Sequence, residues 1–318
     1  MDLTQPHDPE VTAPHPRVVP GLASQTETQP VPRAPAAQVP GPPGRALRPG
    51  RRRTVLAGIL LGIASSLYLL GPWRTTVLLL GVDRAPQGTL VARSDTMILF
   101  TSVPPSGYVG MLSLPRDLWV NVPGVGPNRI NTAHFFGEAE ATGGGPPLAV
   151  QTVGETLGLD IDGYARLTFN GLVESVDALG GVVIELPTAM SGYAAGRHRL
   201  DGKEALAFVR DRAGSDDFSR MQRAQLFLRA VLRQSANPLS WPRLPLATAA
   251  LLRSVDTDLP PWEWPRLALA VLRVGPDGID GRTITRSMVR PFATDQGAQV
   301  LYPNWDLINP MLMEMFGQ

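Results

Sequence analysis

The sequence contains no cysteine, and histidine is rare in it. The absence of cysteine excludes disulfide bonds, thiolate metal sites and thiol catalysis, and it fits a compartment outside the reducing cytosol. The four histidines are widely separated, so neither a zinc motif nor a Ser-His-Asp arrangement can be argued from them. We expect His134 to pack in the fold or face water rather than to catalyse. The histidines are His7, His15, His134 and His198.

Lysine is almost absent as well: Lys203 is the only one among 29 Lys and Arg residues. The formal net charge is only +1, and we find neither a helix-turn-helix pattern nor a basic stripe. The sequence therefore predicts no nucleic-acid partner. Because a codon bias accounts for most of the arginines, their positions are more informative than their number.

The N-terminal region lacks the apolar residues that a folded domain needs. Its first fifty residues contain twelve prolines, from Pro6 to Pro49, and almost no aromatic residues. Such a segment cannot bury enough surface to offset the entropy of ordering. We interpret residues 1–53 as a disordered, proline-rich tail.

An uncharged apolar run follows over residues 54–71. Eighteen helical residues at ~1.5 Å each span roughly 27 Å, close to the hydrocarbon thickness of a bilayer. Several arginines precede the run, and only Arg74 follows it closely. Because positive residues favour the cytoplasmic side of a membrane, this asymmetry predicts a cytoplasmic N-terminus and an extracytoplasmic main domain. The alternative, a cleaved signal peptide, is disfavoured because the leader is long and no convincing Ala-x-Ala site follows.

The remainder, residues 72–318, has the pattern of an α/β domain. Its strand-like runs are apolar on both faces, which indicates a central sheet covered by helices. We expect strands at 76–82, 96–103, 108–114, 119–122, 165–169, 182–186 and 283–289. We expect helices at 131–141, 148–157, 171–179, 201–208, 218–234, 243–253, 262–273 and 305–316.

Charged residues gather where these segments end. Asp83 follows the first strand, Arg93 and Asp95 precede the second, and Arg116 and Asp117 follow the third. Strand ends that share one sheet edge are where open α/β folds bind ligands. Carboxylate oxygens suit Mg²⁺ and guanidinium groups suit phosphate, so the pattern predicts a magnesium and pyrophosphate site. The competing interpretation is a set of surface ion pairs and turn caps.

Side-chain periodicity extends this site. In an extended segment Arg210 and Arg212 project to the same face, as do Arg93 and Asp95. Two adjacent arginines repel each other unless an anion lies between them. Arg220 and Arg223 are three residues apart on one helical face. The Leu, Ala, Val and Met stripes are core positions, or the lining of an apolar groove for a lipid tail.

An ordered series of short motifs runs from about Leu78 to Leu232. It resembles the LytR-CpsA-Psr family of bacterial envelope proteins. The motifs are Leu79-Leu-Gly-Val-Asp83, Arg93-Ser-Asp-Thr-Met97, Leu112-Ser-Leu-Pro-Arg-Asp117, Arg129-Ile-Asn131, Asp177-Ala-Leu-Gly-Gly-Val182, Leu200-Asp-Gly-Lys-Glu-Ala-Leu206, Val209-Arg-Asp-Arg212 and Asp217-Phe-Ser-Arg220.

The resemblance implies an α/β/α sandwich with a central mixed sheet, preceded by one transmembrane helix. The long disordered, proline-rich tail before them is not a feature that the family explains. The motif core would span residues 78–232, and a helical extension residues 238–318. The implied activity is a Mg²⁺-dependent phosphotransferase, with a pyrophosphatase side activity, on the outer face of the cell membrane. It would move a polyprenyl-pyrophosphate-linked glycopolymer onto a wall acceptor such as peptidoglycan and release polyprenyl phosphate.

The resemblance also implies roles for individual residues. Asp83 and Asp95 would bind Mg²⁺. The catalytic contacts to the diphosphate would come from Arg93, Arg116, Arg210 and Arg212. Substrate binding would involve Arg129, Arg220, Arg223, Asp117 and Asp217, the last two by orienting neighbouring arginines. Asp83 or Asp95 would take the proton of the attacking hydroxyl, and the residues do not decide between them.

The sequence departs from the family pattern in the long helix. Where relatives commonly read Arg-Gln, Arg223 is followed by Ala224, and Gln225 comes one residue later. This shift turns the glutamine by about 100° around the helix. Two alternatives to a transferase stay open: a non-catalytic polyprenyl-phosphate carrier or sensor, and a structural or regulatory envelope protein.

Overall fold

The computed structural model describes residues 50–82, 90–211 and 217–317, and side chains from Arg53 onward. The chain divides at Arg53 into the units Met1–Arg53 and Thr54–Gln318. The helix α1 spans Gly50–Leu69. Within the described residues, no helix has both the length and the apolar composition needed to cross a membrane. The span expected over residues 54–71 stays a prediction.

A six-stranded mixed sheet forms the centre of the domain, in the order β10-β3-β2-β1-β6-β9. Its strands are β1 (Thr75–Val82), β2 (Ser94–Val103), β3 (Tyr108–Ser113), β6 (Gly163–Thr168), β9 (Val255–Thr257) and β10 (Asp280–Thr283). The pairs β1–β6 and β3–β10 are parallel, and the other neighbours are antiparallel. The central strands are apolar on both faces, as expected of strands covered on both sides.

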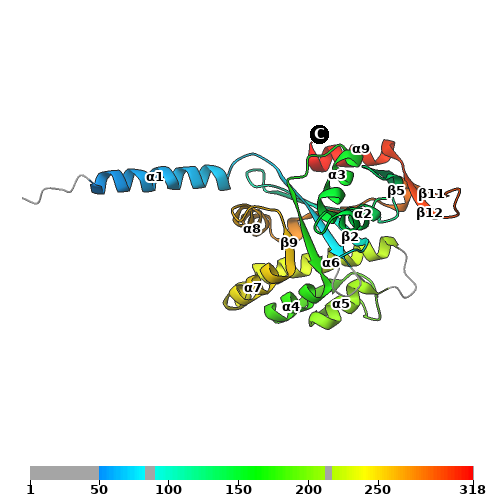
Figure 1. Ribbon diagram of the computed structural model, residues 1–318. Coiled ribbons are helices and arrows are strands. Elements are labelled where there is room, and N and C mark those ends of the chain that lie inside the picture. The colour runs from blue at the N-terminus through cyan, green and yellow to red at the C-terminus, as the bar shows by residue number, and fades with distance from the viewer. Residues whose placement is uncertain (1–49, 83–89, 212–216, 318) are drawn as a thin grey trace, which may run out of the picture. The chain divides into compact units, whose positions relative to one another are not determined.

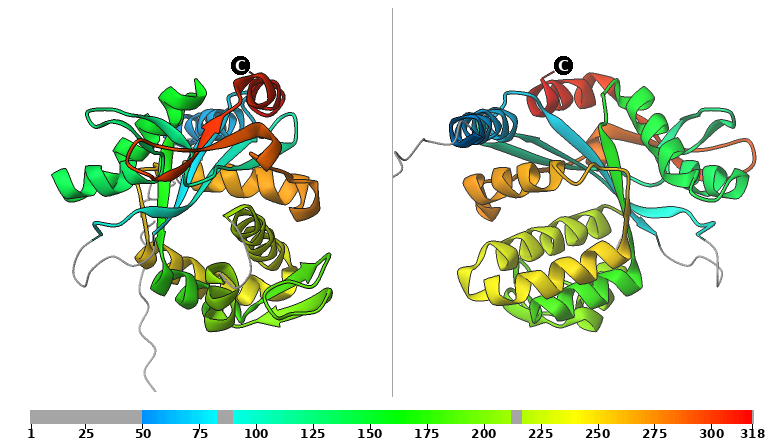
Figure 2. Two further views of the ribbon diagram at one scale, coloured as in Figure 1. Left: turned by 90° about the vertical axis from the view of Figure 1, so that its right-hand side faces the viewer. Right: turned by 60° about the vertical axis from the view of Figure 1, so that its left-hand side comes forward.

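Helices cover both faces of this sheet (Figures 1 and 2). One face packs against α2 (Thr132–Glu140), α3 (Gly145–Leu157) and α9 (Trp305–Phe316). The other carries α4 (Phe169–Leu179), α6 (Asp217–Ala236), α7 (Leu244–Ser254) and α8 (Glu263–Val274). The predicted α/β/α sandwich with a mixed central sheet is confirmed.

Alternating side chains of the strands supply the two faces. Leu78 of β1 and Leu99 of β2 are buried against the α2, α3 and α9 side. Ile98 and Phe100 of β2 point to the other face, where they pack near α6 and α8. This two-residue period is what a strand with two apolar faces requires.

Three two-stranded sheets and shorter elements complete the fold. The hairpins pair β4 (Trp119–Val122) with β5 (Gly126–Arg129), β7 (Val182–Leu186) with β8 (Gly196–Leu200), and β11 (Val289–Ala293) with β12 (Gln299–Pro303). The helix α5 spans Gly202–Arg210, and the 3₁₀ helices are η1 (Pro238–Arg243), η2 (Pro276–Gly278) and η3 (Arg286–Met288).

The expected strand at 283–289 is wrong. The chain there leaves the sheet after Thr283, passes through η3 and enters β11 at Val289. The strand that joins the sheet, Asp280–Thr283, is short and polar and lies at the sheet edge. Backbone pairing to β3 sets its position, and an apolar pattern does not mark such an edge strand.

Candidate functional site

Arg116 lies at the centre of a cluster of charged side chains. It follows β3, and its Nη1 is 2.9 Å from Oδ1 of Asp95 at the start of β2. Its Nε is 2.9 Å from Oδ1 of Asp217, the first residue of α6, and 3.5 Å from Oδ2 of Asp117. One guanidinium therefore joins carboxylates from three separate parts of the chain.

Two further arginines complete this cluster. Arg220, one turn along α6, approaches the Oδ1 atoms of Asp217 and Asp95 at 3.4 and 3.6 Å. Arg129, the last residue of β5, places its Nε 3.1 Å from Oδ1 of Asp117. The structure thus gathers six predicted site residues, which we call the charged cluster: Arg116, Arg129, Arg220, Asp95, Asp117 and Asp217.

Burial shapes the electrostatics of the charged cluster. Loss of solvent raises the pKa of Asp217, although Arg116 and Arg220 counteract this shift. Burial alone would lower the pKa of Arg116, but Asp217, Asp95 and Asp117 outweigh it and the pKa is raised. Because three guanidinium groups balance three carboxylates, the six side chains carry no formal excess charge. Positive charge for an anionic ligand must come from neighbouring arginines.

Arg93 and Arg210 are two further arginines predicted to belong to the site. Both side chains are exposed. Arg93 directly precedes β2 and is two residues from Asp95 of the charged cluster. Arg210 is the last residue of α5, and its guanidinium carbon lies 4.9 Å from the centroid of the Phe169 ring, a cation–π distance. Asp83 and Arg212, the other predicted ligands, lie outside the described residues.

The expected extended conformation around Arg210 is wrong. The helix α5 begins with a capping box, in which Asp201 and Glu204 satisfy each other's backbone N–H groups. The helix continues through Arg210, its last residue, and Asp211 is its C-cap. The alternation expected between Arg210 and Arg212 involves a residue outside the described ranges.

The long helix α6 contributes one arginine to the charged cluster and buries the next. Arg223 is 2% exposed and donates to the backbone carbonyl of Asp211, which ties α6 to the end of α5. Gln225 donates to Oγ of Ser113 at 3.0 Å and to the carbonyl of Arg282. The displaced glutamine therefore joins α6 to β3 and β10.

A large apolar cavity of about 570 Å³ lies between the sheet and the helices of one face. Its floor is formed by side chains of β1, β2 and β6, and its walls by α4, α6, α7 and α8. The lining includes Leu79, Ile98, Leu167, Leu172, Phe227, Leu228, Val231, Leu251, Leu267 and Val271. An unbranched or branched hydrocarbon chain suits such a lining, since the site offers it almost no polar partner.

Part of the cavity lining is next in the chain to predicted site residues. Thr96, Val209 and Ala224 line the cavity, and each is the immediate chain neighbour of a site residue: Asp95, Arg210 and Arg223. Phe169, under the guanidinium of Arg210, lines it as well. A molecule with an apolar tail and an anionic head can therefore contact both regions at once.

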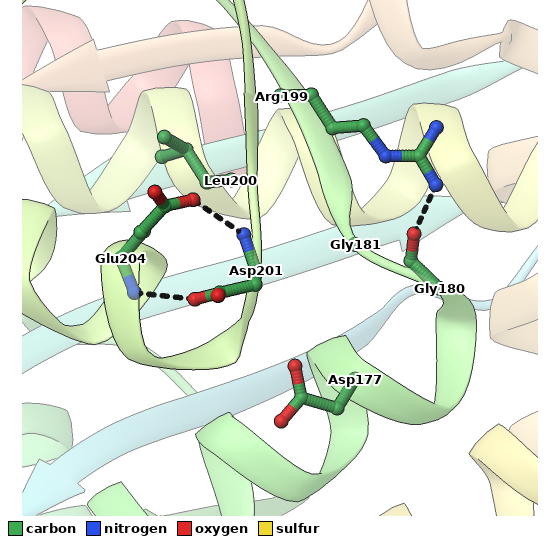
Figure 3. Close-up of a pocket in the computed structure, with 7 residues that line it drawn as sticks. All are labelled: Asp177, Gly180, Gly181, Arg199, Leu200, Asp201 and Glu204. Atoms are coloured by element: carbon green, nitrogen blue, oxygen red, sulfur yellow. Dashed lines mark hydrogen bonds between the residues drawn. The ribbon is translucent and has the colours of Figure 1, made fainter.

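A second, smaller cavity of about 250 Å³ lies between the end of α4 and the start of α5 (Figure 3). Its polar groups are engaged in folding contacts. Arg199 donates to the carbonyl of Gly180, and Asp177 accepts from the backbone N–H of Gly202 at 2.7 Å. Figure 3 also shows the reciprocal bonds between Asp201 and Glu204 that begin α5. We assign this cavity a structural role.

A buried polar network, unforeseen from the sequence, supports the segment before Arg93. Nδ1 of His134 lies 2.7 Å from the carbonyl of Ala92, and Nε2 lies 3.2 Å from Nη1 of Arg166. Arg166 also donates to Glu138 at 2.8 Å and to Asp256 at 2.6 Å. The signal in the sequence was an arginine inside the apolar run that forms β6.

Of the two residues predicted to bind Mg²⁺, Asp95 lies within the described residues, where its carboxylate contacts Arg116 and Arg220. Within the described ranges, no group of three or more His, Cys, Asp or Glu side chains is arranged to hold a metal ion. Mg²⁺ usually needs only one or two carboxylates, because substrate phosphates and water supply its other ligands. Asp95 offers such a carboxylate within the charged cluster.

The sequence pattern that defines the LytR_cpsA_psr family matches residues 73–306. The chain belongs to this family. Its members with assigned names include the polyisoprenyl-teichoic acid–peptidoglycan teichoic acid transferase TagU of Oceanobacillus iheyensis, 40% identical over 189 residues. That match covers 58% of each chain. TagT of Bacillus subtilis, of the same named activity, is 35% identical over 52% of this chain and 54% of its own.

The chain thus spans less than two thirds of the length of these relatives. The regulatory protein MsrR of Staphylococcus aureus is also similar, at 30% identity over 59% of this chain and 57% of its own.

Solved structures share the fold. The crystal structure of Bacillus subtilis TagV gives a TM-score of 0.63 at 24% identity, covering 77% of this chain and 98% of TagV. TagT bound to LI-WTA gives a TM-score of 0.61 at 25% identity, covering 77% of this chain and 91% of TagT. The expected family fold is therefore confirmed.

Proposed function

We propose that this protein is a phosphotransferase that moves a polyprenyl-pyrophosphate-linked glycopolymer onto a cell-wall acceptor such as peptidoglycan. One observation carries the proposal: an apolar cavity of about 570 Å³ is lined by Phe169, which lies under the guanidinium of Arg210, and by Thr96, the chain neighbour of Asp95 in the charged cluster. The names of TagU and TagT support the same chemistry.

In the proposed reaction the oxygen of an acceptor hydroxyl attacks the phosphorus that carries the glycopolymer. A new P–O bond forms, the anhydride P–O bond breaks, and polyprenyl phosphate leaves with the bridging oxygen. The hydroxyl proton passes to a carboxylate, for which the candidate is whichever of Asp83 and Asp95 is not fully engaged with Mg²⁺. A pyrophosphatase side activity is the same step with water as the acceptor.

The arginines would act by electrostatic stabilisation. Negative charge develops on the leaving phosphate, and guanidinium groups already held in position stabilise it without reorganising. Asp117 and Asp217 hold Arg116, Arg129 and Arg220 in place through ion pairs. Mg²⁺, held by Asp95 and Asp83, would neutralise further charge on the phosphate oxygens.

We also propose an extracytoplasmic location for residues 72–318, with the apolar run at 54–71 as membrane anchor. The arginines before this run and the uncharged composition of the run support the proposal. A polyprenyl substrate resides in the membrane, so an anchored domain would meet it there.

The proposal is tested by incubating the full chain with a lipid-linked saccharide pyrophosphate, Mg²⁺ and peptidoglycan fragments. Release of polyprenyl phosphate is measured for the wild type, Arg93→Ala and Arg210→Ala. Loss of one such contact raises the barrier by about 3 kcal/mol, so release should fall by at least about a hundredfold. Arg197→Ala, an exposed arginine of β8, is the control and should react normally.

A carrier or sensor is the second candidate, because an apolar cavity requires only that a lipid binds. It predicts lipid that co-purifies with the protein and no product under any condition. A structural or regulatory protein predicts neither lipid nor product, and tolerance of both arginine substitutions.

A further inference from the structure

Three aromatic side chains lie in a row beside the charged cluster, and we call them the aromatic ladder: Trp119, Phe292 and Tyr302. The rings of Trp119 and Phe292 are 6.1 Å apart between centroids, at an interplanar angle of 86°. Those of Phe292 and Tyr302 are also 6.1 Å apart, at 76°. Each ring therefore meets its neighbour edge to face, an arrangement in which aromatic contacts are favourable.

The aromatic ladder is connected to the charged cluster through both backbone and side chains. Trp119 opens β4 and pairs in register with Arg129, whose Nε contacts Asp117. The hairpin β11–β12 is fixed to the same place, because Leu301 N–H donates to the carbonyl of Asp117 at 3.0 Å. Arg129 also donates to the carbonyl of Gln299 at 2.9 Å.

The aromatic ladder is open to solvent. Tyr302 is 48% exposed, and the side chains of Trp119 and Phe292 are half-buried. Arg290 is exposed and pairs in register with Tyr302, so its side chain projects from the same face of the hairpin. A row of exposed rings bordered by a polar group is more than the packing of this hairpin requires. It suits a ligand with both apolar and polar faces.

A sugar ring has these properties, because its C–H groups present an apolar face and its hydroxyl groups form a polar rim. An aromatic ring covers the apolar face and leaves the hydroxyl groups to hydrogen-bond with neighbouring side chains or water. Several rings in a row suit consecutive sugars of a chain.

The position of the aromatic ladder indicates which sugar it binds. Val120, Val122 and Val289 of β4 and β11 pack into the core on the α3 and α9 side of the sheet, opposite the apolar cavity. A donor with its tail in the cavity and its pyrophosphate at the charged cluster must extend its sugars away from the cavity. The strands β5, β11 and β12 lie together at one end of the domain (Figure 1).

We propose that the aromatic ladder binds the sugars of the donor glycopolymer next to the pyrophosphate. This inference rests on the proposed function, because it takes the position of the pyrophosphate from it. The aromatic ladder is then the part of the site that distinguishes a sugar-bearing polyprenyl pyrophosphate from one without sugar.

The test compares two probes on the full chain, a prenyl pyrophosphate and the same prenyl pyrophosphate carrying a disaccharide. Dissociation constants are measured by calorimetry for the wild type, Tyr302→Ala and Tyr302→Phe. Loss of one ring contact should weaken the disaccharide probe by about three- to tenfold. The sugar-free probe should bind all three proteins alike, and Tyr302→Phe, which keeps the ring, should match the wild type.

A matched control is Trp241→Ala in η1, an aromatic residue 54% exposed and outside the aromatic ladder. It should leave both dissociation constants unchanged. Equal affinity of wild type and Tyr302→Ala for the disaccharide probe would overturn the aromatic ladder as a sugar site, and so would equal weakening of both probes. If the wild type binds neither probe, the proposed function itself fails, and the sugar site fails with it.

Discussion

At the scale of single residues, the contacts that Arg116 makes with two carboxylates require a guanidinium group. Its Nη1 and Nε separately contact Asp95 and Asp217, so its planar guanidinium sets the distance between two carboxylates on different elements. A lysine carries its charge on one nitrogen and has no fixed fork. The geometry of the charged cluster therefore depends on the identity of this residue as well as on its charge.

We accordingly predict that Arg116→Lys lowers the release of polyprenyl phosphate by at least tenfold. Asp95 and Asp217 lose their common partner, and both shift relative to the bound phosphates. Initial rates at saturating donor measure the effect. Arg282→Lys is the matched control, since Arg282 joins Asp280 and Glu314 with a similar exposure but outside the charged cluster. Equal rates for wild type and Arg116→Lys would contradict the prediction.

His134 gives a residue-scale prediction about pH. Burial, and then the nearby charge of Arg166, lower the pKa of His134 below its ordinary 6.5, although the bond to Ala92 opposes this shift. The unfolded chain therefore takes up a proton below pH 6.5 that the folded protein does not. The free energy of unfolding should fall as the pH drops below 6.5 toward the lowered pKa.

Denaturant unfolding between pH 5 and pH 8 measures this dependence. His134→Gln removes the titrating group, so this variant should lose that part of the slope. His198→Gln, a half-buried position of β8, keeps His134 and should keep the slope. A slope that persists unchanged in His134→Gln would show that another group causes it.

At the scale of elements, the ion pair of Arg166 and Glu138 joins β6 to α2. Their side chains are 5% and 2% exposed, and Glu138 also accepts from the N–H groups of Gly143 and Gly145. The pair therefore fixes the turn between α2 and α3 together with the contact of His134 to Ala92. Arg166 contacts His134, and His134 contacts the carbonyl of Ala92, so the ion pair is connected to the segment that carries Arg93.

We predict that Arg166→Met destabilises the protein by about 3–5 kcal/mol, because Glu138 keeps a buried charge without its partner. The double variant Arg166→Met with Glu138→Gln should be less destabilised than the sum of the two single variants. Free energies of unfolding for the four proteins give the coupling energy. Additive effects within about 0.5 kcal/mol would contradict a direct buried interaction.

The elements also show what a sequence can and cannot reveal. The central strands and most helices were predictable, because apolar periodicity is local and strong in them. The gathering of Arg116 and Asp95 follows from their positions at element ends, and Asp217 was expected only from the family resemblance. The pairing of the three side chains depends on distances between elements. The helical state of Arg210 differs from the extended conformation expected there, because Ala205, Phe208 and Val209 continue the apolar pattern of α5 up to Arg210.

The aromatic ladder illustrates the same limit. Trp119 and Tyr302 are separated by more than 180 residues, and each has the pattern of an ordinary strand residue. Their strands meet through the bridge between Leu118 and Leu301 and through the bond from Arg129 to the carbonyl of Gln299. Long-range pairing of short strands leaves no local signal in the sequence.

At the scale of the whole molecule, the two faces of the sheet differ in packing. The face toward α2, α3 and α9 is closed by a continuous core that includes Leu112, Ile130 and Met315. The face toward α4, α6, α7 and α8 keeps the large cavity. A hydrocarbon chain bound there would make packing contacts with the apolar lining, and in protein cores stability rises with the volume that is packed.

We therefore predict that the full chain, purified in mild detergent, carries a polyprenyl lipid that mass spectrometry of an organic extract detects. Ala268→Phe on α8 places a ring in the cavity lining and should reduce the lipid per protein several-fold. Ala249→Phe makes the same change at an exposed position of α7 outside the lining and should retain the lipid. If the wild type yields no polyprenyl lipid, or both variants retain it equally, the cavity is not the site of the tail.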